Sequence, residues 1–228
     1  MKRIIMFAVA CCFCLTSCVF TVSGSNGGSD SAIGSGADQT RTFDAAPFDI
    51  LTVNIPCDVV YETGERKVVI VASEKYMEHI LVEQDGNSLV VKTDDKKIRS
   101  FKSTKIYVTS DLLSSLTVNG AVDMECRHGI RSAGDFALTI NGAGDVEIKG
   151  LDADAIMVRC NGAADLEILD ITAAGIDVTI NGAGDATLTG AVDYANLTIN
   201  GAGDINARGL VANTIRPSVR GVGSIVTR

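Results

Sequence analysis

The chain has 228 residues, a hydrophobic fraction of 46%, an aromatic fraction of 5% and no tryptophan. This composition excludes a collagen, a disordered chain and a multi-span membrane protein, and it requires a core of aliphatic side chains. The formal net charge is −8, and it becomes −10 when Lys2 and Arg3 are removed with the predicted signal. So acidic a surface disfavours nucleic acid as a partner.

The N-terminus has the layout of a secretory signal. Lys2 and Arg3 precede an apolar run from Ile4 to Leu15, which is too short to span a bilayer as a helix. The run ends in Leu15-Thr16-Ser17-Cys18, which resembles the lipobox of bacterial lipoproteins. That resemblance implies that residues 1–17 are removed and that Cys18 is acylated, so that its lipid holds the protein on a membrane.

The sequence leaves two points about this signal open. Cysteines also occur inside the apolar run, so the alternative is a plain secretory signal with a chance cysteine at position 18. Val19 follows Cys18, and there is no acidic run of the kind that resembles a surface-export signal. We therefore expect an outer-membrane lipoprotein of the bacterial cell envelope, facing either the periplasm or the outside.

The segment after the signal is predicted to be a flexible tether. Ten of the sixteen residues from Ser23 to Asp38 are Gly or Ser, a composition typical of a flexible coil. We assign residues 18–42 to the lipidated cysteine and this tether. Residues 43–228 are predicted to form one β-domain, with irregular coils over 43–115 and regular repeats over 116–228.

A nearly constant segment recurs along the second half of the chain. It reads Leu-Thr-Ile-Asn-Gly-Ala-Gly-Asp in its commonest form, and its asparagines recur in steps of 22, 20, 20 and 19 residues, at Asn119, Asn141, Asn161, Asn181 and Asn200. Arg220 continues the spacing in a degenerate copy, and Asn54 belongs to an upstream copy. The 65 residues between Asn54 and Asn119 would hold about three more periods.

Each period contains two stretches in which apolar and polar residues alternate, separated by Gly, Asn and Asp. This pattern predicts two half-buried strands and two turns per period. Such short strands bury their apolar sides by stacking, which predicts an all-β, parallel β-solenoid with coils of about 20 residues. Residues 43–228 would give about nine coils and a length of about 45 Å. An antiparallel sandwich is the alternative, and it stays open for residues 43–115.

The turn predicts two columns of stacked side chains. Asparagine amides can bond to the same amide in the next coil. The aspartates would form a column of like charges that repel by about 0.9 kcal/mol per pair. Two explanations for that column stay open, namely backbone N–H groups of each carboxylate's own turn, and bound Ca²⁺. The members of this column are Asp123, Asp145, Asp165, Asp185 and Asp204.

No catalytic constellation is evident in the sequence. His79 and His128 are the two histidines, and neither lies in a zinc-binding spacing or beside a nucleophile motif, so we assign no catalytic residue and no metal ligand. Glu147 and Glu167 are one period apart, which favours a solvated ladder over a catalytic carboxylate pair. Cys126 and Cys160 occupy positions that other copies fill with Ile or Leu, and the sequence does not decide whether Cys57 pairs.

The recurring turn, the lipobox and an opening that runs from Phe43 to Val53 together resemble the "putative auto-transporter adhesin, head GIN domain" family of Bacteroidota. The resemblance covers about residues 43–220. It implies an all-β coil and a role in adhesion, and it supplies no catalytic residues or cofactors.

From these observations we expect a lipid-anchored envelope protein that binds or adheres without catalysis. Its partners would be the membrane, through the lipid, and another protein or a glycan, on the Thr and Glu faces or along the Asp turns. Two alternatives remain, a glycan-active β-helix enzyme and a structural element that associates with itself through open strand edges.

Overall fold

A computed structural model describes residues 37–94 and 104–228. It contains one short helix, α1 (Glu74–Met77), and fifteen strands. The strands are β1 (Asp38–Phe43), β2 (Ile50–Val53), β3 (Cys57–Thr63), β4 (Lys67–Ser73), β5 (Ile80–Asp85), β6 (Ser88–Thr93), β7 (Lys105–Ser110), β8 (Ser115–Cys126), β9 (Ile130–Arg131), β10 (Phe136–Asp152), β11 (Ala155–Cys160), β12 (Ala163–Ile180), β13 (Ala186–Ile199), β14 (Ile205–Val219) and β15 (Ile225–Val226).

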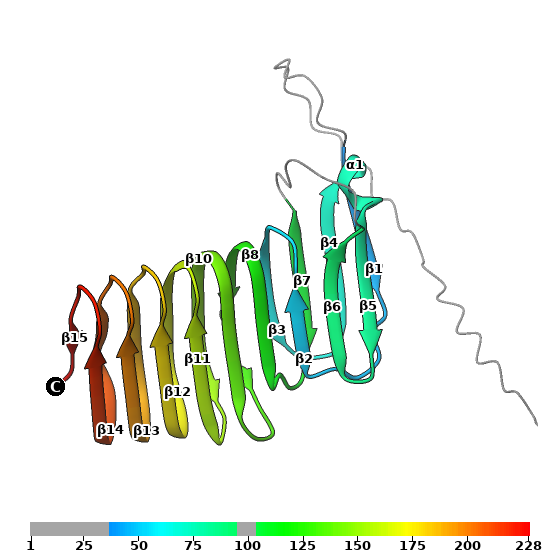
Figure 1. Ribbon diagram of the computed structural model, residues 1–228. Helices are drawn as coiled ribbons and strands as arrows, with labels where there is room; N and C mark the ends of the chain where they lie inside the picture. Colours follow the sequence, from blue (N-terminus) through cyan, green and yellow to red (C-terminus); the bar gives the residue numbers. More distant parts are fainter. Residues whose placement is uncertain (1–36, 95–103) are drawn as a thin grey trace, which may run out of the picture.

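The strands from β8 to β15 form the predicted parallel solenoid, which makes about six turns (Figure 1). Equivalent residues of successive repeats lie side by side, as Leu138 does with Leu116 and with Val158. We call the strand residues before each Asn-Gly turn the A segments (51–53, 115–118, 136–140, 155–160, 175–180, 194–199 and 214–219). Those that follow the turn are the B segments (57–63, 122–126, 146–149, 166–169, 186–189 and 205–208).

The core is the set of inward columns that the alternation predicts. In the A segment of β10, for example, Phe136, Leu138 and Ile140 are buried, and the residues between them point outward. Stacking these columns produces one continuous aliphatic core along the solenoid. It explains how a chain with few aromatic residues buries enough apolar surface to fold.

The N-terminal part differs from the expectation of nine coils, which is wrong. Strands β2 and β3 stack directly on β8, so that Leu51 pairs with Leu116 and Asp58 with Asp123. The residues between β3 and β8 therefore do not add three periods. They supply β6 and β7, which pair in parallel with β2 and β3, and β5 and β4, which close the end by antiparallel pairing. This arrangement is a cap, and β1 pairs with β4 at its outer edge.

The β-structure begins at Asp38, upstream of the expected boundary at Phe43. The predicted signal, Cys18 and the tether up to residue 36 lie outside the described residues. Within the described ranges, no helix has both the length and the apolar character needed to cross a bilayer.

Candidate functional site

The turns are joined by a ladder of asparagine side chains. The Nδ2 amide of Asn141 donates to Oδ1 of Asn119 at 2.8 Å, and the same bond recurs at every coil. The other rungs join Asn119 to Asn54 at 2.6 Å, Asn161 to Asn141 at 2.8 Å, Asn181 to Asn161 at 2.9 Å and Asn200 to Asn181 at 2.8 Å. The predicted amide stacking is confirmed, and the ladder holds successive coils in register.

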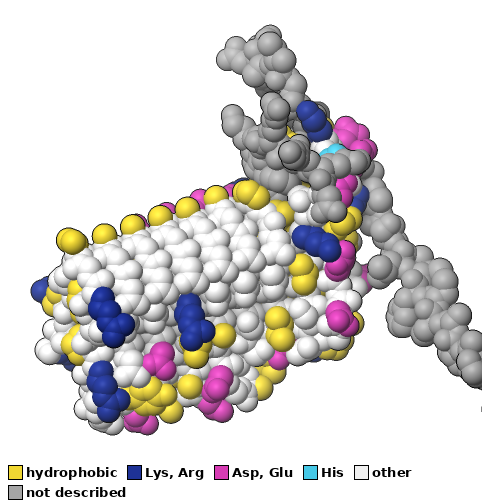
Figure 2. All heavy atoms as spheres, in the orientation of Figure 1, with side chains coloured by type: hydrophobic (Ala, Val, Ile, Leu, Met, Phe, Trp, Pro, Cys, Tyr) yellow, Lys and Arg dark blue, Asp and Glu magenta, His cyan; other side chains and the backbone are white. Residues whose placement is uncertain are grey.

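A second column, formed mostly by threonine side chains, runs beside the asparagines on the outer side of the A segments. Thr117 pairs with Thr52 and Thr139, and Thr179 pairs with Thr198. We call this whole outer surface, asparagine ladder included, face A. Figure 2 shows it as a broad area of mostly uncharged atoms, with a few basic side chains and with acidic and hydrophobic side chains toward its lower edge. Face A therefore offers amides and hydroxyls at a regular spacing of about 4.8 Å.

The carboxylates of the aspartate column accept hydrogen bonds from backbone N–H groups of the neighbouring coil. Oδ1 of Asp165 accepts the backbone N–H of Asp185 at 2.9 Å, and Oδ1 of Asp185 accepts that of Asp204 at 2.8 Å. The donor belongs to the next coil, so the expectation of a donor in the carboxylate's own turn is corrected. Each such bond is charge-assisted, and it offsets the repulsion within the column. Among residues 37–94 and 104–228 no group of three or more His, Cys, Asp or Glu side chains could hold a metal ion.

The opposite side of the coils, formed by the outward residues of the B segments, is acidic. We call it face B. Glu147 lies between Glu125 and Glu167 in register, as expected for a solvated ladder. Lys149 pairs with Glu147 at 2.6 Å, and Arg127 pairs with Glu125. These neighbouring glutamates raise the pKa values of both cations.

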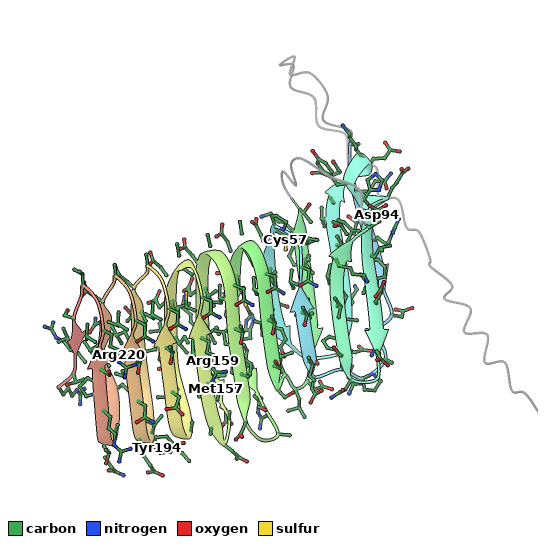
Figure 3. The ribbon with its side chains drawn as sticks, viewed as in Figure 1. Cys57, Asp94, Met157, Arg159, Tyr194 and Arg220 are labelled. Carbon is green, nitrogen blue, oxygen red and sulfur yellow. The ribbon has the colours of Figure 1, made fainter. Side chains whose placement is uncertain are left out.

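One aromatic side chain lies on face A. Tyr194 is 37% exposed, and its ring covers Gly175 on the neighbouring coil, where a Cβ would come within 2.0 Å of the tyrosine Cζ. Gly175 is buried beneath the ring, so one ring face contacts the backbone and the other faces solvent. Figure 3 places Tyr194 on the same side as Met157, Arg159 and Arg220. Only a residue without a side chain leaves room for this packing.

Polar and apolar side chains surround this tyrosine. Asn196, two residues further along the strand, donates to Oδ1 of Asp177 at 2.5 Å. Met157 is 40% exposed and pairs with Asp177 in register. The sequence contains a signal for this contact, because Tyr194 follows Gly175 by 19 residues, which is one repeat.

The other residues considered in the sequence lie apart from face A. His79 bonds through Nδ1 to Oδ2 of Asp94 at 2.9 Å in the cap. Phe136 is buried in the core. Cys57, Cys126 and Cys160 are free and buried, which answers the question left open about Cys57. Burial raises their pKa values, to about 12 for Cys57 and about 11 for Cys126, so these thiols are not poised as nucleophiles.

The turns also line an open hollow of about 340 Å³ beside the cap. Asp58 and Asp123 border it, and Asp58 pairs with Lys105 at 3.3 Å. Thr104 also lines the hollow, and its buried hydroxyl has no hydrogen-bond partner among the described residues. The hollow brings together too few ligating oxygens to be assigned as a cation site.

The fold resembles solved structures of low sequence identity. A "putative adhesin" of Parabacteroides distasonis ATCC 8503 is 19% identical with a TM-score of 0.71, over 84% of this chain and 83% of that one. A "putative adhesin" of Bacteroides fragilis NCTC 9343 is 20% identical with a TM-score of 0.68, over 84% and 97%. A "putative lipid binding protein" of P. distasonis is 16% identical with a TM-score of 0.65, over 84% and 98%. These likenesses establish the fold.

No curated protein matches the chain. The sequence model of one family matches twice, over residues 47–170 and 136–228, which together cover the cap and all the coils. The chain belongs to the family described as "Putative auto-transporter adhesin, head GIN domain".

Proposed function

We propose that this protein is a lipid-anchored binding module of the bacterial cell envelope, without catalytic activity, and that face A is its adhesive surface. The observation that carries the proposal is the regularity of face A. Its amides and hydroxyls are fixed by coil-to-coil pairing before any ligand arrives. A surface that is already ordered loses little conformational entropy on binding.

The family membership supports adhesion over catalysis. The family is described as adhesins, and adhesion needs an extended surface, not a reactive cluster. The one histidine–carboxylate pair of the described residues, His79 with Asp94, lies in the cap and away from face A.

The lipid anchor rests on the sequence at Cys18. An acyl chain there, followed by a flexible tether that ends near Asp38, would attach the protein through its capped end. The coils would then extend away from the membrane, with β14 and β15 at the far tip. We expect the protein at the outer membrane, on the periplasmic or the outer side.

Lipid binding of the kind named for one structural relative is not part of this proposal. The inward columns of this chain are filled with packed aliphatic side chains, of which Leu138, Val158 and Leu197 are fully buried. Such an interior leaves an acyl chain only the outer surface.

Two measurements on the full chain test the proposal. Cells that produce it should incorporate radiolabelled palmitate into the protein, and the Cys18→Ala variant should lose both the label and the membrane fraction. Cys11→Ala, which changes a cysteine inside the predicted signal, is the matched control and should leave both unchanged. Loss of label in the control alone would refute the assignment of Cys18.

Adhesion is tested with face A changed by charge. The wild-type protein should coat beads that adhere to glycan- or matrix-coated surfaces, and Thr179→Glu with Thr198→Glu should abolish adhesion by placing two carboxylates on the flat face. Glu147→Gln with Glu167→Gln on face B should adhere normally. Equal adhesion of all three proteins would contradict a role for face A.

A further inference from the structure

The charged residues of the solenoid are unevenly distributed over its sides. The aspartate ladder and the glutamates of β8, β10 and β12 lie at the turns and on face B. On face A, Arg159 replaces a threonine of the second column, Arg216 pairs in register with Asn196, and Arg220 replaces an asparagine of the ladder. Among the outward residues of the A segments and ladder positions from β11 to β14, the charged side chains are therefore these three arginines and Asp177, whereas the whole chain has a net charge of −8.

These three arginines are not neutralised by the protein itself. Within the described parts of the chain, Arg159, Arg216 and Arg220 take part in no ion pair, whereas Arg127 and Lys149 on face B each pair with a glutamate. Arg159 and Arg216 belong to coils three steps apart and are offset by two residues along the strand, so their backbones are about 16 Å from one another. An unpaired cation on a flat surface is available to an anionic ligand.

Tyr194 lies at the start of its A segment, two residue positions before the row that contains Arg216. Its coil is adjacent to that of Arg216, and its ring lies flat over Gly175 with the outer face open. Asn196 beside it is held by Asp177, so a donor and an acceptor group flank the ring in fixed positions. A flat ring with fixed polar neighbours is suited to the apolar face of a sugar ring, whose hydroxyls point outward around it.

We infer that the coils from β11 to β14 bind an anionic polysaccharide along face A, with one sugar ring on Tyr194 and with the acidic groups of the chain paired to Arg159, Arg216 and Arg220. This inference rests on the proposed function and names its ligand class. Three arginines are few for a nucleic acid, because nucleic-acid-binding proteins commonly neutralise about six to ten phosphates.

The test measures binding of the full chain in detergent to two immobilised polymers of similar length, polygalacturonate and neutral dextran. We expect binding to polygalacturonate that weakens as salt is raised, and at least tenfold weaker binding to dextran. Arg159→Ser, Arg216→Ser and Arg220→Ser together should reduce the affinity for polygalacturonate about tenfold or more. Arg208→Ser, on the same strand but in a B segment, is the matched control and should bind as the wild type does.

The aromatic contact is tested separately. Tyr194→Ala should weaken binding about fivefold to tenfold, and Tyr194→Phe should keep most of it, because the ring face is the contact. Tyr107→Ala is the matched control, because Tyr107 is 40% exposed on β7, away from these coils. Thermal unfolding of each variant separates loss of contact from loss of fold.

Three results would overturn the inference. They are equal affinity for dextran and polygalacturonate, wild-type binding by the triple arginine variant, and equal or tighter binding of single-stranded DNA. Adhesion that persists while polygalacturonate binding is absent would leave the proposed function intact and refute only this ligand class. Absence of both adhesion and polygalacturonate binding would count against the proposed function and against this ligand class.

Discussion

The side-chain amide of Asn119 donates to Oδ1 of Asn54 at 2.6 Å, although 65 residues of sequence separate them. This bond joins the first regular repeat directly to the N-terminal coil, and it extends the asparagine ladder to the upstream copy of the repeat. The cap and the solenoid are therefore one continuous hydrogen-bonded unit, in which each coil pairs with the next.

Removing a rung from the middle of the ladder should cost more than removing its end. Asn161 both donates and accepts, so Asn161→Ala breaks two bonds, whereas Asn54→Ala breaks one. We expect a loss of about 1–2 kcal/mol in the free energy of unfolding for Asn161→Ala and about half of that for Asn54→Ala. Urea unfolding followed by circular dichroism measures both. Equal losses would show that the rungs are not additive.

A single methyl group in the turn should prevent the coils from stacking. A Cβ on residue 162 would lie 1.8 Å from the carbonyl oxygen of Gly142, and neither backbone can move without breaking the ladder. Gly162→Ala should therefore lower the free energy of unfolding by more than about 3 kcal/mol or yield insoluble protein. Gly134→Ala is the control, since a Cβ there meets nothing within 4 Å. Normal stability of Gly162→Ala in thermal unfolding would contradict the close approach of the coils.

Stability should fall in alkali because of the buried thiols. Burial raises the pKa of Cys57 to about 12, with a smaller effect of the Asp58 carboxylate, and that of Cys126 to about 11, from an ordinary 9.0. The unfolded chain then loses its thiol protons first, so the stabilisation is complete below about pH 9 and is lost as the pH rises toward 11–12. Each thiol adds a slope of at most about 1.4 kcal/mol per pH unit.

Urea unfolding at several pH values between 8 and 11 measures this slope, and Cys126→Ala should make it shallower. Burial also raises the pKa of Tyr61, so Tyr61→Phe is needed to separate the phenol from the thiols. A wild-type stability that stays level up to pH 11 would disprove the assignment.

The last coil carries features that guard an open strand edge. The backbone N–H of Arg220 donates to the carbonyl oxygen of Ile199 on the preceding coil. Because backbone N–H groups alternate in direction along a strand, the backbone nitrogen of residue 217 points away from that coil, toward the open edge. Pro217 has no N–H to offer there, and charged Arg216 and Arg220 flank it. We expect Pro217→Val with Arg216→Thr to associate end to end, and the wild type to stay monomeric, in analytical ultracentrifugation. A monomeric double variant would show that other features protect the edge.

The regular coils could be predicted because the repeat gives the same information several times. Each copy places Leu, Ile or Val at the same parity, and the constant Asn-Gly turn fixes which residues of adjacent copies pair. Cys126 and Cys160 were recognised as core residues for this reason, and both are fully buried. Local alternation alone would have left the register open.

The cap could not be predicted in the same way. Strands β4 to β7 alternate like any half-buried strands, and alternation does not tell a parallel coil from an antiparallel hairpin. The upstream copy Leu51-Thr52-Val53-Asn54 was recognised, but the residues after it were assigned to three further periods, whereas the copy stacks directly on the first repeat. The aspartate bonds were missed because the donor of each carboxylate lies one coil away.

Arg220 stands where a further asparagine would extend the ladder, and Oδ1 of Asn200 is left buried without a donor among the described residues. The ladder therefore ends at Asn200, and a further repeat would have to be inserted before the last coil, whose edge Pro217 protects. Duplication of one repeat would lengthen the body by about 4.8 Å without disturbing the coils beneath it. The number of repeats would therefore determine the length of the solenoid, and with it the distance between the cap and the tip, in equal steps.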